Sequence, residues 1–368
     1  MTRVGVLGGG QLGRMMGLAG LPLGLEFRFY DPGAATPVSG LGRHQRAAWT
    51  DDEALDAFAE DVDVLTWEFE NIPVETAQRL ASAVPTFPPP VALSVAQDRL
   101  REKERFTALG IPTNQFHDVQ SAADLEAGIG QIGLPAVLKT RRMGYDGKGQ
   151  QVLRDAVDVD AVFREMGEVP CLLEAFVPFD REVSLVGVRT AEGETRFYPL
   201  VENVHVRGIL HTTTAPAPNR EALQPNAEKH LSALMVDLDY VGVMAIEFFV
   251  KDGGLIANEF APRVHNSGHW TQDGAVTSQF ENHLRAGLGL PLGSTEARGV
   301  TVMLNLIGDV PKAGDVFLEY GTRLHLYGKT PRPGRKLGHV NVSGTDLAKV
   351  QATIARIQAA MPEGAGPI

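Results

Sequence analysis

Short apolar runs alternate with amphipathic stretches along the first 84 residues of the chain. The apolar runs cover residues 4–7, 27–30 and 64–67, and the amphipathic stretches cover residues 11–19, 52–59 and 74–83. Strands that alternate with helices indicate a parallel sheet wound with helices, which is an α/β fold. Pro88, Pro89 and Pro90 then interrupt the pattern, because three consecutive prolines continue neither a helix nor a central strand. We expect a domain boundary there.

The pattern changes twice after this boundary. A strongly charged segment, 94–110, predicts one helix that ends at Gly110, with Pro112 just beyond it. Residues 113–175 contain a predicted strand, a helix and the glycine-rich sequence MGYDGKGQ. From residue 182 onward, period-two alternation predicts strands, with helices near 221–236 and 274–287. The later part of the chain is therefore expected to be α+β.

Length and charge limit the classes of function. With 368 residues, 43% of them hydrophobic, the chain can form a large core and exceeds one ordinary domain. A formal net charge of -11 argues against general affinity for nucleic acid or an anionic membrane, so an anionic ligand needs a local basic cluster. Cys171 is the single cysteine, no long apolar run is present, and the chain starts directly with a predicted strand. We therefore expect a cytoplasmic protein without disulfides.

The first chemical motif is the loop Gly8-x-Gly10-x-x-Gly13 within VGVLGGGQLGRM. Glycines let a backbone approach a phosphate closely, and the helix that follows directs its free N–H groups toward it. Asp31 stands where a dinucleotide-binding fold places an acid for the ribose. The same spacing also suits any closely packed turn between strand and helix. The loop alone leaves a dinucleotide, another phosphate or simple packing open.

A second glycine-rich segment follows a predicted strand that ends at Lys139. The loop from Gly144 to Gln150 can close over a polyphosphate, and Lys139 offers a fixed ammonium to it. It lacks the P-loop pattern, and an ordinary hairpin tip is the alternative. Downstream, Glu174 ends an apolar strand, the backbone of 175–177 offers hydrogen-bonding groups to a purine, and Glu182 can accept from ribose hydroxyls. Acids at strand ends are more often solvated.

Two glutamates flank a predicted hairpin in AIEFFVKDGGLIANEF. If 252–254 form a three-residue loop, Glu247 lies directly opposite Glu259 on one sheet face. A two-residue loop would place Glu247 opposite Asn258 instead. Facing carboxylates repel unless a cation lies between them, and with phosphate oxygens they suit Mg²⁺. The alternative is an exposed hairpin face with scattered acids.

Two polar clusters lie farther along the chain. The sequence APRVHNSGHW carries donors suited to a small planar or phosphorylated anion, namely Arg263, His265, Asn266, Ser267 and His269. Zinc is less favoured, because the residues between the histidines are not helical and no third soft ligand is near. A surface loop with satisfied histidines is the alternative. The sequence YGKTPRPGRK forms either a monophosphate site or a solvated turn, with Lys329, Arg332, Arg335 and Lys336.

Five stretches in this order make the chain similar to the N5-carboxyaminoimidazole ribonucleotide synthetases of the ATP-grasp superfamily. They are GGGQLGRM, EFENIP, GYDGKGQ, NEFAPRVHNSGHWT and RPGRKLGH. The resemblance runs from residue 1 to about residue 345. It departs at Trp67, where a tyrosine is expected, and this departure touches no candidate catalytic group.

The resemblance implies an ATP-grasp fold in three parts. Residues 1–95 would form an N-terminal, Rossmann-like α/β domain that faces a ribonucleotide rather than NAD. Residues 96–177 would form a lid that carries the glycine-rich loop. Residues 178–368 would form the larger mixed-sheet C-terminal domain, with a small β subdomain from about residue 297.

The same resemblance assigns roles to the motif residues. ATP would contact Arg99, Lys139, Gly144, Tyr145, Asp146, Gly147, Lys148, Gly149, Gln150, Glu174, Ala175, Phe176, Val177, Glu182, His205 and Asn258. Aminoimidazole ribonucleotide would contact Gln11, Glu70, Asn71 and Tyr145, with its phosphate on Lys329, Arg335 and Lys336. Mg²⁺ would be held by Glu247 and Glu259. Bicarbonate and carboxyphosphate would be held by Arg263, His265, Asn266 and Ser267.

The implied activity is ATP- and bicarbonate-dependent carboxylation of the ribonucleotide's exocyclic amine in purine biosynthesis. The glycine-rich loop would close over carboxyphosphate and exclude water, and His265 is a candidate proton acceptor. The implied partners are small molecules, with neither nucleic acid nor a membrane. The resemblance also implies a cytoplasmic homodimer that passes its product to a separate mutase.

Three other functions stay open at the level of sequence. An NAD-dependent oxidoreductase explains the first glycine loop but leaves GYDGKGQ and the paired glutamates unexplained. Another ATP-grasp ligase, such as formate-dependent glycinamide ribonucleotide transformylase or biotin carboxylase, differs in substrate; RVHNSGHW and RPGRK favour the carboxylase named above. A catalytically silent nucleotide-binding or scaffold protein would bind ATP without releasing ADP.

Overall fold

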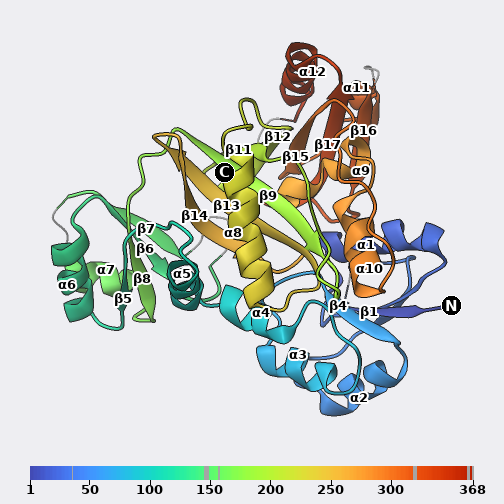
Figure 1. Ribbon diagram of the computed structural model, residues 1–368, viewed down its shortest axis with the longest axis horizontal. Coiled ribbons are helices and arrows are strands. Elements are labelled where there is room, and N and C mark those ends of the chain that lie inside the picture. The colour runs from blue at the N-terminus through green and yellow to red at the C-terminus, as the bar shows by residue number, and fades with distance from the viewer. Residues whose placement is uncertain (35, 145–148, 156–157, 318–320, 363–364, 367–368) are drawn as a thin grey trace.

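The computed structural model describes residues 1–34, 36–144, 149–155, 158–317, 321–362 and 365–366, and its strands form three sheets (Figure 1). The N-terminal sheet lies at one end of the molecule and the sheet of residues 116–175 at the other. The large sheet lies between them and continues toward the C-terminal helix. No helix in the described part of the chain is long and apolar enough to span a membrane.

The N-terminal sheet is parallel throughout, as the alternating pattern predicts. Its strand order is β3 (Arg43–Gln45), β2 (Glu26–Tyr30), β1 (Arg3–Leu7) and β4 (Val64–Trp67). The sequence interpretation missed β3, which is short and polar. The helices of this region are α1 (Gln11–Gly20), η1 (Leu21–Leu23), α2 (Asp52–Glu60) and α3 (Val74–Ala81).

The prediction of one charged helix over 94–110 is wrong. Two helices occupy the region, α4 (Pro90–Ala96) and α5 (Arg99–Ala108). Pro90 occupies the first turn of α4, where a missing N–H breaks no helical hydrogen bond. Asp98 is extended and caps α5 through the N–H of Leu100, and its carboxylate also pairs with Arg141 at 2.7 Å. A pairing with a residue 43 positions away therefore breaks the helix.

The second sheet is antiparallel, with strand order β5 (Phe116–Val119), β8 (Cys171–Ala175), β6 (Ala136–Thr140) and β7 (Gln150–Leu153). Helices α6 (Ala122–Ile132) and α7 (Val159–Glu165) accompany it. Leu125, Leu138 and Leu173 belong to a core of its own, separate from the cores of the other sheets. We call residues 116–175 the lid.

The large sheet has nine strands among the described residues. Its order is β14 (Gly254–Ala261), β13 (Gly242–Lys251), β9 (Arg181–Arg189), β11 (Val201–Val206), β12 (Ile209–Ala215), β15 (Val300–Ile307), β17 (Lys336–Gly344) and β16 (Thr322–Leu326), with β10 (Thr195–Phe197) beside β9. Its helices are α8 (Gln224–Asp237), η2 (Asn266–Gly268), α9 (Thr271–Gly274), α10 (Gln279–Gly287), α11 (Ala313–Val316) and α12 (Leu347–Ala359). Helices α8 and α10 pack on β9 and β13.

The N-terminal sheet and the large sheet share one hydrophobic core. Val4 and Phe27 belong to the same buried cluster as Val243, and α1 packs against α10. Two buried polar contacts cross this junction: His283 lies 2.9 Å from the hydroxyl of Thr66, and Trp67 donates to the carbonyl of Pro262. The end of β4 is therefore fixed beside the segment that follows β14.

Candidate active site

One cavity of about 1350 Å³ is lined by the N-terminal sheet, the lid and the large sheet. It brings together nearly all the predicted site residues that the structure describes, namely Gln11, Glu70, Asn71, Arg99, Lys139, Gly144, Gln150, Glu174, Ala175, Phe176, Val177, Glu182, His205, Glu247, Asn258, Glu259, Arg263, His265, Asn266, Lys329, Arg335 and Lys336. Gly149 and Ser267 are described but do not line it. Tyr145, Asp146, Gly147 and Lys148 lie outside the described residues.

The N–H groups of the first glycine loop are occupied by the protein's own carboxylates. Glu68 accepts hydrogen bonds from the N–H groups of Gly10, Leu12 and Gly13 at 2.7, 3.1 and 3.0 Å. Asp31 accepts from Gly9 at 2.9 Å. These are the donors with which such a loop binds a phosphate, and Asp31 is the acid expected to hold a ribose. The geometry therefore disfavours a dinucleotide at this loop.

The two ends of the chain meet beside this loop. Lys329 donates to the side-chain oxygen of Gln11, 318 positions away, and its ammonium lies 5.7 Å from the ring centre of Tyr327. Burial lowers the pKa of Lys329 to about 8, against the opposing effect of Glu68. Arg332, Arg335 and Lys336 line the same cavity. The basic turn therefore faces the cavity, as a phosphate site requires.

Arg263 joins the N-terminal sheet to the segment after β14. Its guanidinium Nε pairs with Glu70 and its NH1 donates to the carbonyl of Val264 at 2.9 Å. Burial raises the pKa of Glu70, but attraction by Arg263 outweighs burial and brings that pKa to about 2. Glu70 is therefore ionised, and the pair holds a guanidinium at the centre of the cavity wall.

His265 follows Arg263 by two positions, with its ring between Ser267 and Glu247. The N–H of Ser267 donates to Nδ1 at 3.3 Å, so Nδ1 is an acceptor and the neutral ring carries its proton on Nε2. Nε2 lies 3.6 Å from Glu247. Burial, with the charge of Arg263, lowers the pKa of His265 to about 3. Ser267 is fully buried, and its contact with Nδ1 helps to hold the ring in place.

Asn266 makes a reciprocal amide pair with Asn305 of β15. Each amide nitrogen donates to the other's oxygen, at 3.1 and 2.9 Å. Asn305 also donates to the carbonyl of Leu210. The sequence interpretation missed Asn305, because its pairing depends on a strand 39 positions away.

The paired glutamates face each other, although the loop is the two-residue alternative and not the three-residue one. Lys251 pairs with Gly254, so the loop has two residues, and Asp252 and Gly253 adopt positive φ of 51° and 74°. A bulge at Asn258 then adds one residue to β14 and restores the pairing of Glu247 with Glu259. The bulge therefore places Glu247 opposite Glu259, as a three-residue loop would have done.

The paired glutamates differ in their surroundings. Arg99 donates to Glu259 at 3.1 Å, and its charge lowers the pKa of that carboxyl despite burial. Burial, with repulsion from Glu259, raises the pKa of Glu247 to about 7. Nearby, His205 lies 2.7 Å from Glu182, which raises the pKa of the imidazole against the effect of burial.

The lid contributes a buried carboxylate with one unused oxygen. Oε2 of Glu174 accepts from Lys139 at 3.0 Å and from Asn114 at 2.9 Å. Oε1 has no hydrogen-bond partner among the described residues, and neither has Oδ1 of Asn258. Glu174 is 1% exposed, so it is not the solvated strand-end acid that was the alternative. Both free oxygens belong to residues that line the cavity.

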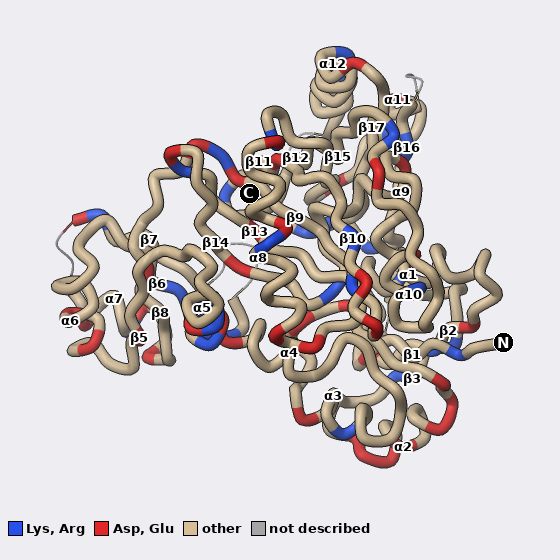
Figure 2. Tube along the Cα trace, viewed as in Figure 1, with Lys and Arg blue, Asp and Glu red and all other residues tan. Residues whose placement is uncertain are grey.

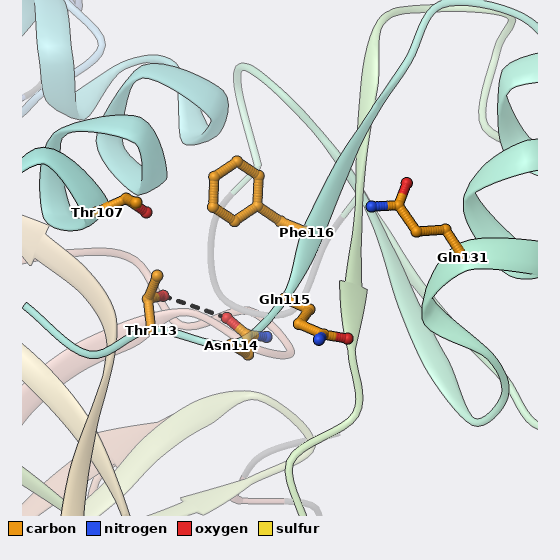
Figure 3. A pocket seen from close by; sticks show the side chains of 6 residues that line it. All are labelled: Thr107, Thr113, Asn114, Gln115, Phe116 and Gln131. Carbon is orange, nitrogen blue, oxygen red and sulfur yellow. Dashed lines mark hydrogen bonds between the residues drawn. The ribbon is translucent and has the colours of Figure 1, made fainter.

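A smaller cavity of about 350 Å³ also has Asn114 in its lining (Figure 3). It is lined by Thr107, Thr113, Asn114, Gln115, Phe116 and Gln131. None of these side chains is charged, and Oγ1 of Thr113 lies 3.3 Å from Oδ1 of Asn114.

Acidic residues also gather away from the cavity. Figure 2 shows them at α2, where Asp51, Asp52 and Glu53 begin the helix and Asp51 caps it through the N–H of Ala54. Carboxylates near a helix N-terminus are stabilising there. Part of the net negative charge of the chain therefore comes from acids at a helix N-terminus, whereas basic side chains line the cavity.

Three domain families match the chain. Residues 1–97 match the ribonucleotide synthetase preATP-grasp domain, and residues 104–280 match the ATP-grasp domain. Residues 301–353 match the phosphoribosylaminoimidazole carboxylase C-terminal domain. The expected fold, an ATP-grasp fold that follows a parallel-sheet N-terminal domain, is confirmed.

Relatives match the chain over nearly its whole length. The N5-carboxyaminoimidazole ribonucleotide synthase of Pseudomonas aeruginosa is 55% identical, over 97% of this chain and 99% of that protein. The crystal structure of the synthetase from Thermus thermophilus has a TM-score of 0.94 and 52% identity, over 98% and 99% of the chains. The synthase from Aspergillus clavatus, in complex with ADP and 5-aminoimidazole ribonucleotide, has a TM-score of 0.90 and 30% identity, over 98% of each chain. The chain therefore belongs to the N5-carboxyaminoimidazole ribonucleotide synthase family of ATP-grasp ligases.

Proposed function

We propose that this chain carboxylates the exocyclic amine of 5-aminoimidazole ribonucleotide, using ATP and bicarbonate. An oxygen of bicarbonate attacks the γ-phosphorus of ATP, which gives carboxyphosphate and ADP. The amine nitrogen then bonds to the carboxyl carbon, directly or after CO₂ is released, while phosphate leaves and the nitrogen loses a proton. Such phosphoryl transfer depends mainly on positioning and charge stabilisation.

ATP would lie between the lid and the large sheet. The free Oε1 of Glu174 fits the exocyclic amine of adenine, and Lys139 beside it fits a phosphate. The stacked rings of Phe179 and Phe249, 4.7 Å apart, line the same part of the cavity. Glu182, paired with His205, would accept from the ribose hydroxyls.

Mg²⁺ fits the pair Glu247 and Glu259. Two facing carboxylates and the unpartnered Oδ1 of Asn258 are oxygen donors, which Mg²⁺ prefers. No cluster of three or more acidic, His or Cys side chains within the described ranges forms a metal site, so phosphate oxygens would complete the coordination. The ion would neutralise charge on the transferring phosphoryl group.

Bicarbonate and carboxyphosphate would lie against Arg263 and His265. The guanidinium offers N–H donors to an oxyanion, and the Nε2–H of neutral His265 offers another. His265, a candidate proton acceptor from the sequence, then serves as a hydrogen-bond donor instead. Ser267 would orient that ring, and Asn266, held by Asn305, would shape the pocket.

The ribonucleotide would occupy the end of the cavity beside the first glycine loop. Lys329, Arg335 and Lys336 would hold its phosphate, in an otherwise acidic protein. Gln11, Glu70 and Asn71 line the adjoining wall and would contact the ribose and imidazole. This places the amine toward Arg263, between the two substrate regions.

The assembly and the cell compartment are proposed from the family resemblance. We expect a homodimer in the cytoplasm that acts on small molecules and passes its product to a separate mutase. The domain limits 1–95, 96–177 and 178–368 are proposed in the same way. The separate core of the lid supports the second of these units.

One observation carries the proposal: a single cavity is lined by Lys329 of the basic turn, by the lid pair Lys139 and Glu174, and by Arg263. The experiment measures ADP release from Mg-ATP while aminoimidazole ribonucleotide and bicarbonate are added singly and together. We expect release that requires the ribonucleotide and rises with bicarbonate. Release only with glycinamide ribonucleotide and formate would contradict the substrate assignment, and no release at all would contradict the enzyme class.

A further inference from the structure

Lys103 is a buried lysine that the sequence interpretation did not single out. It lies on α5 four residues after Arg99, and only 1% of it is exposed. Its Nζ donates to Oγ1 of Thr113, Oδ1 of Asn114 and the carbonyl of Ala257, at 2.9, 3.0 and 3.1 Å. Buried lysines are rare unless they are paired, so this arrangement calls for a specific role.

The partners of Lys103 favour its ammonium form, although burial lowers the pKa of that group. The amide nitrogen of Asn114 donates to Glu174 and to the carbonyl of Ala175, which leaves its Oδ1 as an acceptor. The hydroxyl of Thr113 donates to the carbonyl of Ala257, so its oxygen accepts from Lys103. Three acceptors around one Nζ use the three N–H donors of an ammonium.

This ammonium lies 3.7 Å from Oε2 of Glu174, the oxygen that Lys139 also contacts at 3.0 Å. Burial raises the pKa of Glu174, but Lys103 and Lys139 outweigh it and hold the pKa at about 2. Two ammonium groups and Asn114 thus hold one oxygen of the carboxylate. The other, Oε1, has no partner in the described part of the chain.

We propose that Lys103 is a positioning residue that sets the purine specificity of the nucleotide site, an inference that rests on the proposed binding of ATP there. Lys103 keeps Glu174 an ionised acceptor, and its unpartnered Oε1 would accept from the base. A 6-amino purine donates an N–H to that oxygen. A 6-oxo purine presents a second acceptor there, and two facing acceptors repel.

Removing the charge of Lys103 would relax this discrimination. With Lys139 alone beside it, the pKa of buried Glu174 would rise from about 2 toward the assay pH, so a larger fraction of the carboxyl would be protonated. A protonated carboxyl both donates and accepts hydrogen bonds, so it tolerates a 6-oxo purine. ATP would lose its charged acceptor, while the ribonucleotide end of the cavity would keep all its contacts.

The experiment compares ATP with inosine triphosphate as the nucleotide in the ADP- or IDP-release assay, with ribonucleotide and bicarbonate present. Lys103→Met removes the charge at similar length. Lys103→Gln also removes it but keeps amide donors for Thr113 and Asn114, so the test continues if the Met variant does not fold. Arg105→Met is the matched control, because Arg105 lies on the same helix but pairs at the surface with Asp237.

We expect the ratio of kcat/KM for ATP to that for inosine triphosphate to fall by about tenfold or more in the Lys103 variants. The fall should come from a higher KM for ATP, with the KM for the ribonucleotide unchanged. A folded Lys103 variant with the wild-type ratio would overturn the inference and leave Lys103 a structural contact. Wild-type protein that releases no ADP would instead overturn the proposed function.

Discussion

The two ends of the cavity are built differently. At the N-terminal end, the sheet shares a continuous core with the large sheet, and the donors of the glycine loop are occupied by Glu68 and Asp31. At the lid end, the sheet has a separate core, and Glu174 and Asn258 each keep an oxygen without a partner in the described residues. The glycine loop at one end therefore has its donors satisfied within the protein, whereas the other end keeps oxygens that a ligand can satisfy.

This difference shows that a glycine motif alone does not reveal its ligand. The N–H groups of the loop 8–13 have the geometry that binds phosphate in other folds, but Glu68, just after β4, supplies the anion here. Whether such a loop binds a phosphate depends on whether its N–H donors are already hydrogen-bonded within the protein. A sequence shows the donors, but only the fold shows their partners.

The largest expected effect is at Arg263, which joins the segment after β14 to the N-terminal end through Glu70. We expect Arg263→Ala to lower kcat by about a hundredfold or more, because it removes a charged donor to the developing oxyanion. ADP affinity should stay unchanged, as measured by equilibrium titration. Arg285→Ala, which breaks a surface pair with Glu281, is the control. Normal turnover in Arg263→Ala would remove Arg263 from the chemistry.

A smaller effect is expected at the filled glycine loop. Glu68→Ala leaves the N–H groups of Gly10, Leu12 and Gly13 without their acceptor, which costs about 1–3 kcal/mol per buried unsatisfied group. We expect a lower melting temperature, with partial recovery when formate is added to replace the carboxylate. Asp56→Ala, at an exposed pair with Arg79, is the control. A melting temperature equal to that of wild type would show that the loop does not depend on Glu68.

At the lid end, the expected effect is a change in the Mg²⁺ concentration that ADP release requires. Glu259→Gln removes one charge of the facing pair, so we expect the Mg²⁺ concentration for half-maximal ADP release to rise about tenfold or more. Chelation of Mg²⁺ should stop ADP release in wild type. Glu194→Gln, a partly exposed glutamate paired with Arg196, should leave the Mg²⁺ dependence as it is. The same Mg²⁺ dependence in Glu259→Gln would place the ion elsewhere.

The smallest expected effect is on the pH dependence of the unfolding free energy, at the junction between the N-terminal sheet and the large sheet. His283 is buried between Thr66 and the N–H of Val243, and burial lowers its pKa to about 3. The unfolded chain then binds a proton that the folded chain does not, so the contribution is complete above pH 6.5 and is lost as pH falls toward 3. Between pH 6.5 and 4.5, His283→Asn should lower the pH slope of the unfolding free energy by up to about 1.4 kcal/mol per unit. Equal slopes would mean that His283 is already protonated in the fold.

Much of the fold followed from local patterns. The strands and helices predicted in the first 84 residues lie within about two residues of their observed limits, since apolar periodicity defines them. The break at Asp98 was missed, because it depends on Arg141. The pairing of Glu247 with Glu259 was expected only for a three-residue loop; the two-residue loop gives it as well, because a bulge at Asn258, which leaves no local signal, shifts the register. Lys103 was missed because its partners come from separate segments of the chain.

The central claim is that the lid end binds the nucleotide and the N-terminal end binds the ribonucleotide. It is tested most directly by two matched substitutions, Lys139→Met and Lys329→Met, with KM measured for both substrates in each variant. Lys139→Met should raise the KM for ATP about tenfold and leave that for the ribonucleotide unchanged, whereas Lys329→Met should do the reverse. If both variants raise the same KM, or if the effects are exchanged, the assignment of the two ends is wrong.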